Sequence, residues 1–167
     1  MTIEHDFFGV LGSDRVGDLH WSETAELGDQ NIDIDLNAPD EESVKIENLD
    51  IAAAMISSLE DLDTQARESL VADLSKDSSK TALYIEQSID ELGPEALSDA
   101  LIWDSGDQQI DFLRSLRLQR VGFHPHNSGS DEHFAVLDYS IAPHETDTLL
   151  IVALDVNGDT VSVEIDD

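Results

Sequence analysis

The chain has 167 residues, of which 38 are Asp or Glu and only 8 are Lys or Arg, so its formal net charge is −30. A body this negative repels nucleic-acid phosphates and anionic membrane surfaces, and it attracts basic proteins and cations. The absence of cysteine excludes a disulfide scaffold, a thiol nucleophile and a cysteine-based zinc or iron–sulfur site.

Short strands are predicted in the first 36 residues. Residues 5–11 form a candidate edge strand, and a second strand covers about 19–27. Residues 32–36 alternate strictly between apolar and acidic side chains, which is the period-two pattern of a half-buried strand. The Gly28-Asp29 pair between these two runs favours a hairpin turn.

The middle of the chain is predicted to be helical, because apolar residues recur there at three- and four-residue spacing. The pattern predicts helices at residues 43–59, about 61–74, about 79–92, 94–101 and about 106–116. Gly93-Pro94 separates the third helix from the fourth, since proline suits the first position of a helix.

The period changes again from residue 118 onward. Four strands are predicted there, at residues 118–123, 133–141, 148–154 and 160–165. The second and third are apolar on both faces, so we expect them in the centre of a sheet. The order of strands, helices and strands predicts an α+β fold, in which an antiparallel sheet built from N- and C-terminal strands packs against a central group of four to five helices.

The length and composition favour one acidic α+β domain covering residues 1–167. A hydrophobic content of 40%, arranged in patterns, is typical of a folded chain. The first residues carry neither a basic segment nor a long apolar run, and no stretch reaches the length that spans a bilayer. We therefore expect a soluble cytoplasmic protein.

Several short segments are similar to a known bacterial family. They are Phe8-Gly9 and residues 32–36, 62–67, 84–86, 121–125 and 134–141. These segments resemble the family of domains of unknown function numbered two thousand and four, and the similarity covers most of the chain. That family has no established activity, so the resemblance implies a small single-domain protein and supplies no catalytic residues. Related small acidic bacterial proteins often neutralise toxins, which offers an analogy only.

His124, His126 and His133 form the candidate metal site. Two histidines two positions apart on a strand project to the same face, and a third across a hairpin could join them as imidazole ligands. The alternative is that all three are solvated side chains of a polar loop. Pro125 bends the strand between the first two and weakens the argument that they share a face.

Arg114, Arg117 and Arg120 bring three of the eight basic residues within seven positions. Guanidinium groups among many carboxylates commonly form ion pairs, and the alternative is a patch that binds phosphate or carboxylate. Asp138 lies inside the apolar run 134–141, where burial would raise the pKa of a functional acid. Its alternative role is an ion pair with Arg120 or Arg117 from a neighbouring strand.

Two tryptophans, Trp21 and Trp103, are candidates for a contact surface, with core filling as the alternative. Arg67, in the second predicted helix, is expected to form an internal ion pair. The sequence contains no nucleophile-elbow serine motif, no phosphate-binding Gly-Lys loop and no dinucleotide fingerprint. No catalytic residue and no cofactor are therefore predicted.

These observations favour a non-catalytic protein-binding domain, of interaction or immunity-like type, whose partner is a basic protein and not a nucleic acid or a membrane. One alternative is a metal-dependent enzyme centred on His124, His126 and His133. Another is a salt-adapted structural protein, since many aspartates and few lysines are typical of halophilic chains. Plain solubility and mimicry of nucleic acid are further explanations of the acidity.

Overall fold

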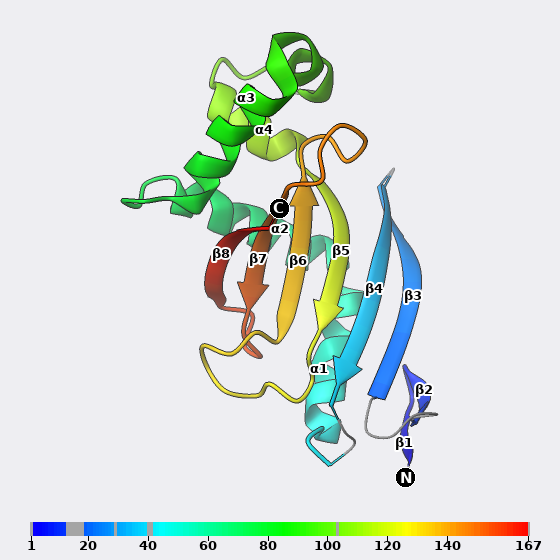
Figure 1. The fold of residues 1–167 in the computed structure, drawn as a ribbon. Coiled ribbons are helices and arrows are strands. Elements are labelled where there is room, and N and C mark those ends of the chain that lie inside the picture. Colours follow the sequence, from blue (N-terminus) through cyan, green and yellow to red (C-terminus); the bar gives the residue numbers. More distant parts are fainter. Residues whose placement is uncertain (1, 13–18, 29, 40–41, 103, 167) are drawn as a thin grey trace.

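The computed structural model describes residues 2–12, 19–28, 30–39, 42–102 and 104–166, which have an α+β fold. The elements in chain order are β1 Thr2–His5, β2 Gly9–Gly12, β3 Leu19–Leu27, β4 Gln30–Ala38, α1 Ile46–Ser57, α2 Leu59–Asp73, α3 Lys80–Ala100, α4 Gln108–Ser115, β5 Arg117–Phe123, β6 Ala135–Ser140, β7 Leu149–Leu154 and β8 Thr160–Asp166. Strands β3 to β8 form a six-stranded sheet in chain order, and β1 pairs with β2 in a separate hairpin (Figure 1).

The large sheet is mixed, which corrects the expectation of an antiparallel sheet. Strands β4 and β5 run parallel, whereas the other neighbouring pairs of this sheet are antiparallel. The reason is that all four helices lie between β4 and β5 in the chain, and a long helical crossover returns the chain to the end of the sheet where β4 began. The predicted contribution of strands from both ends of the chain to one sheet is confirmed, as is the interior position of β6 and β7.

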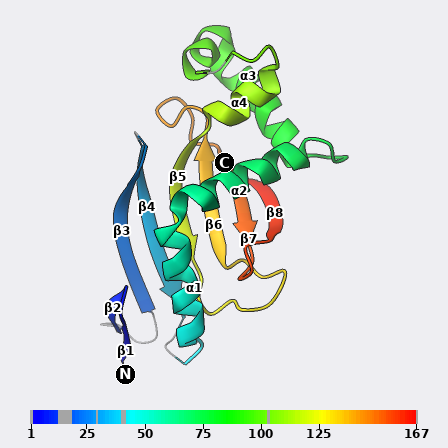
Figure 2. The ribbon, with the colours of Figure 1, turned by 180° about the vertical axis from the view of Figure 1, so that it is seen from behind.

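The helices lie in two places relative to the sheet. Helices α1 and α2 cross one face of it, and α3 and α4 lie beyond the end at which β5 begins (Figure 2). The third and fourth predicted helices form one element, α3, with a break at Gly93, where φ is 77° and ψ is 169°. Among the described helices, none is both long enough and apolar enough to cross a membrane.

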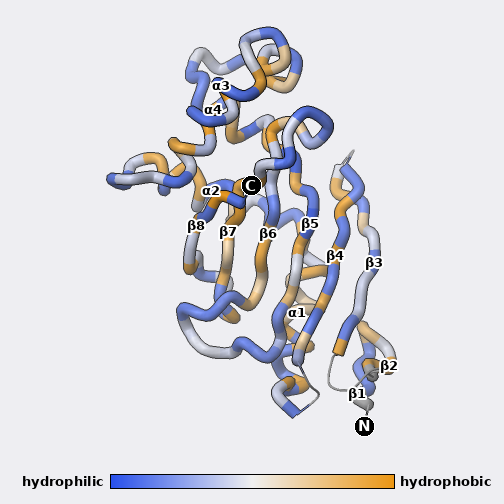
Figure 3. Tube along the Cα trace, viewed as in Figure 1, coloured by the Kyte–Doolittle hydropathy of each residue, from blue (hydrophilic) through white to orange (hydrophobic). Residues whose placement is uncertain are grey.

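Hydropathy along the strands explains which face of the sheet the helices cover. Along β4, Ile32, Ile34 and Leu36 are almost fully buried, while Asp33 between them is exposed. Figure 3 shows this alternation along β4 and a more continuously apolar β7. The buried row faces α1 and α2 in the core, so the polar row faces away from the helices.

The predicted edge strand at residues 5–11 is instead two short strands, β1 and β2, separated by a turn. His5 fixes this hairpin: its Nδ1 accepts a hydrogen bond from the backbone N–H of Phe7 at 3.1 Å, so its Nε2–H donates to Asp50 of α1 at 2.7 Å. The ring of Phe8 packs edge-on against Trp21 of β3, with ring centroids 4.8 Å apart. Hairpin, helix and sheet are thereby joined.

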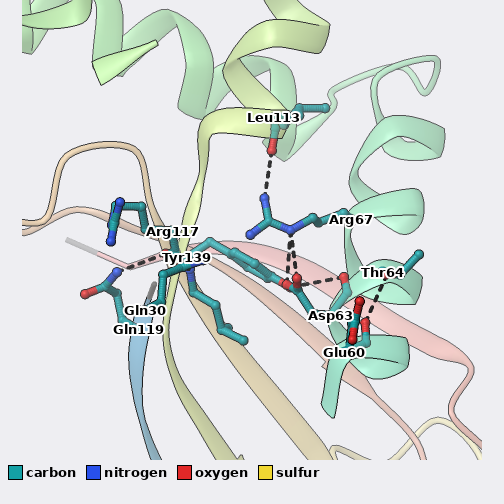
Figure 4. Close-up of polar contacts among 10 residues, drawn as sticks. Gln30, Glu60, Asp63, Thr64, Arg67, Leu113, Arg117, Gln119 and Tyr139 are labelled. Atoms are coloured by element: carbon teal, nitrogen blue, oxygen red, sulfur yellow. Dashed lines mark hydrogen bonds and ion pairs between the residues drawn. The ribbon is translucent and has the colours of Figure 1, made fainter. Parts of the chain in front are cut away.

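An ion pair within α2, which Tyr139 of β6 contacts from the sheet, confirms the predicted internal role of Arg67. Its Nε lies 3.1 Å from both carboxylate oxygens of Asp63, and its Nη1 donates to the backbone carbonyl of Leu113 at 3.1 Å (Figure 4). The phenol of Tyr139 donates to Asp63 Oδ1 at 2.7 Å, and the guanidinium lies 5.1 Å from the centre of that ring. Burial raises the pKa of Tyr139 well above its ordinary value, and the adjacent Asp63 carboxylate raises it further.

Substitution Y139F should lower the free energy of unfolding by about 1–2 kcal/mol, because it leaves the half-buried Asp63 carboxylate with one donor fewer. Urea denaturation at pH 7 measures this change. The matched control is T64A, which removes an exposed hydroxyl on the same helix and should change stability by less than about 0.5 kcal/mol. Equal effects of the two substitutions would show that the Tyr139 hydrogen bond contributes nothing to the fold.

Candidate binding site on the open face of the sheet

We call the side of the six-stranded sheet that faces away from α1 and α2 the open face; it is turned toward the viewer in Figure 1. The register places one row of side chains straight across it, namely Thr24, Asp33, Arg120, Asp138, Ile151 and Glu164. The neighbouring strand positions add the carboxylates of Glu26, Asp35 and Asp166 to the same face. Carboxylates therefore dominate this surface.

Arg120 of β5 forms the central ion pair of the open face. Its Nε lies 2.5 Å from Asp35 Oδ2 and its Nη2 lies 2.9 Å from Asp35 Oδ1, so the contact is bidentate. The hydrogen bonds to Asp35 raise the pKa of Arg120, although burial opposes this. A two-point contact of this kind fixes the plane of the guanidinium as well as its position.

Gly122 lies beneath the contact between Arg120 and Asp35, which joins two neighbouring rows of side chains. Gly122 pairs with Asp35 in the register, directly beneath the ion pair. A Cβ at Gly122 would lie 3.4 Å from Asp35 Oδ1 and 3.5 Å from Arg120 Nη2. These are ordinary van der Waals distances, so the ion pair packs directly over Gly122.

Asp138 of β6 is the most buried carboxylate of the row. It is 9% exposed, and its Oδ2 lies 3.9 Å from Arg120 Nη1, which is too long for a hydrogen bond. Burial raises its pKa; Arg120 lowers it, while Asp166 and Asp35 raise it further. The predicted contact between Asp138 and Arg120 on neighbouring strands is confirmed, but Asp35 is the stronger partner of the arginine.

A shallow groove of about 500 Å³ runs beside this cluster over β3, β4 and β5. Its polar lining comprises His20, Ser22, Glu23, Thr24, Asp33, Asp35 and Arg120. The hydroxyl of Thr24 donates to Asp33 at 3.4 Å, which leaves most of the acceptor capacity of that exposed carboxylate open. Such a lining suits a cationic side chain with several N–H donors.

The three predicted metal ligands lie near one another but are divided. The His124 and His126 rings, just beyond β5, have centroids 6.0 Å apart, whereas His133 Nε2 lies 3.4 Å from the hydroxyl of Ser162 on β8. Burial lowers the pKa of His124, and the neighbouring His126 lowers it further. Across the described ranges, no group of three or more His, Cys, Asp or Glu is arranged to hold a metal ion. Metal binding therefore stays a prediction.

The other predicted site residues are separated. Arg114 is exposed on α4, and Arg117 lines a different cleft from Arg120, so the three arginines form no single patch. Trp21 is half-buried against Phe8, and Trp103 lies outside the described residues. Sequence reasoning missed Asp35, although its place on the polar side of an alternating strand was a usable signal.

Comparisons with protein-family models, with curated proteins and with solved structures found no match to this chain. The resemblance to the family of domains of unknown function stays a prediction.

Substitution D138N should stabilise the protein relative to the wild type increasingly as the pH rises from 3 to 7. Burial raises the pKa of Asp138 in the folded state above the ordinary value of 3.8. At pH values between 3.8 and this raised pKa, the folded state therefore binds more protons than the unfolded state. The contribution of this carboxyl to stability therefore falls as the pH rises through that window. Thermal unfolding at several pH values measures the difference.

The control for D138N is E68Q, which removes one exposed carboxylate from α2. It corrects for the general relief of repulsion in so acidic a protein. A stability difference between D138N and E68Q that stays constant from pH 3 to pH 7 would contradict the assigned effect of burial.

Proposed function

We propose that this protein is a non-catalytic binding domain that docks a basic protein on the open face of its sheet. The observation that carries the proposal is the cluster on that face, in which Arg120 is shared by Asp35 and Asp138 while Asp33 stays exposed with most of its acceptor capacity open. A lysine or arginine of the partner, entering the groove over β3 to β5, would meet Asp33 and Asp35 directly.

The net charge supports the choice of a basic partner. A charge of −30 accelerates the encounter with a cationic surface and opposes the approach of nucleic acid or an anionic membrane. The arrangement of the site determines where on the protein the basic partner binds. Strands hold the carboxylates at fixed positions, so a partner does not have to order flexible side chains on binding.

The immunity-like role is the specific form of this proposal. Neutralising an enzyme with a basic substrate-binding cleft requires a rigid acidic surface that occupies the cleft, and it requires no chemistry from the inhibitor. The open face supplies such a surface, because its side chains project from paired strands and no helix covers it (Figures 1 and 2).

Titration of the isotope-labelled protein with a short arginine-rich peptide tests the proposal by nuclear magnetic resonance. At 0.15 M salt we expect the shift changes to concentrate in β3, β4, β5 and β6. Substitution D33K should weaken peptide binding at least fivefold, because it places a like charge in the groove. Substitution E68K makes the same charge change on α2, remote from the open face, and should weaken binding less than twofold.

Two results would contradict a defined docking face. One is a set of shift changes spread evenly over the helices and the sheet, and the other is equal weakening by E68K and D33K. Either result would mean that the peptide responds only to the overall charge of the protein.

A further inference from the structure

A second cleft, of about 480 Å³, lies at the end of the sheet where β5 begins. It is enclosed by the second half of α3, the start of β5 and the connection between β6 and β7 (Figure 1). Its apolar lining comprises Ala96, Ala100, Ile102, Ile141, Ala142 and Pro143. Ile102 is 69% exposed, so an apolar group that covered it would gain favourable burial. The volume lies within the range of about 300–1,000 Å³ that is usual for small-molecule sites.

Arg117 is the cation in this cleft, and it is the unusual feature. Arg67 and Arg120 each hold an aspartate, and Figure 4 shows Arg117 pointing away from the Arg67 pair. Arg117 is half-buried as a residue, and no ion pair or hydrogen bond reaches its guanidinium from the described ranges of the chain. Although the chain has 38 acidic residues, the N–H donors of this guanidinium are free to bind a carboxylate from outside the protein.

Two exposed carboxylates, Asp99 and Glu145, also line the cleft. They would repel a simple anion that approached Arg117. A ligand that carries both a carboxylate and an ammonium group would instead find a charge of opposite sign for each end. The apolar walls add a requirement for a hydrocarbon side chain.

We propose that this cleft binds a zwitterion with an apolar side chain, either a free apolar α-amino acid or a short peptide of such residues. The ligand carboxylate pairs with Arg117, its ammonium group faces Asp99 and Glu145, and its side chain covers Ile102 and the partly exposed Ala96 and Ala100. The cleft shares no lining residue with the groove proposed for the basic partner. The inference therefore stands independently of that function.

Calorimetry and nuclear magnetic resonance with L-leucine and L-leucyl-L-leucine as probes test the inference on the full chain. We expect saturable binding of at least one probe, with shift changes at residues 96–102 and 141–145. The tighter of the two probes identifies whether a free amino acid or a peptide is the source of the zwitterion. L-Leucinamide lacks the carboxylate and N-acetyl-L-leucine lacks the ammonium group, so both should bind at least tenfold more weakly than L-leucine.

Two matched substitutions locate the carboxylate. R117Q should weaken binding of the tighter probe at least tenfold, whereas R114Q makes the same charge change on the neighbouring helix, outside the cleft, and should change it less than twofold. R117K keeps the charge without the planar fork and should give intermediate affinity. The melting temperature of R117Q should equal that of the wild type, because the guanidinium has no ion pair or hydrogen bond to lose within the part of the chain that the structure describes.

The inference is overturned if neither probe gives a saturable change up to 10 mM. It is also overturned if R117Q binds as tightly as R114Q, or if L-leucinamide or N-acetyl-L-leucine binds as tightly as L-leucine.

Discussion

The parallel pairing of β4 with β5 is the contact on which the sheet depends, since it joins the N-terminal hairpin of β3 and β4 to the C-terminal strands β5 to β8. Four helices separate these strands in the chain, so their pairing closes a long loop and costs loop-closure entropy. The bidentate contact of Arg120 with Asp35 lies across this seam. The Arg120–Asp35 ion pair therefore stabilises the pairing of β4 with β5 and also fixes the positions of charged side chains on the open face.

Two of the few cations of the chain lie beside partly buried carboxylates, one on each face of the sheet. Arg67 stabilises Asp63 beneath the sheet, and Arg120 neutralises Asp35 on the other face. Among the exposed carboxylates of the helices, Asp50 is bound by His5, and the others take part in no ion pair of the described residues because water already solvates them. This division lets the molecule keep a strongly negative exterior around a largely apolar core.

Local periodicity was enough to predict most elements. The alternation around Ile34 located β4, and the spacing of apolar residues located α1 to α4 within a few positions. Residues 5–11 were wrongly read as one strand, because a turn within a short aromatic segment leaves little periodic signal. The partner of Arg120 was equally hidden: Asp35 lies 85 positions away, and only the parallel crossover brings it close. Asp138 was found because a lone acid within an apolar run is a local signal.

The break at Gly93 gives α3 two independent directions. The first half of this helix packs with α2, while the second half carries Ala96, Asp99 and Ala100 into the wall of the Arg117 cleft. With φ at 77°, a single backbone position sets the angle between the halves, and side chains other than glycine rarely adopt it. A substitution at Gly93 alone would therefore change the width of the Arg117 cleft, while every residue that lines the cleft stayed the same.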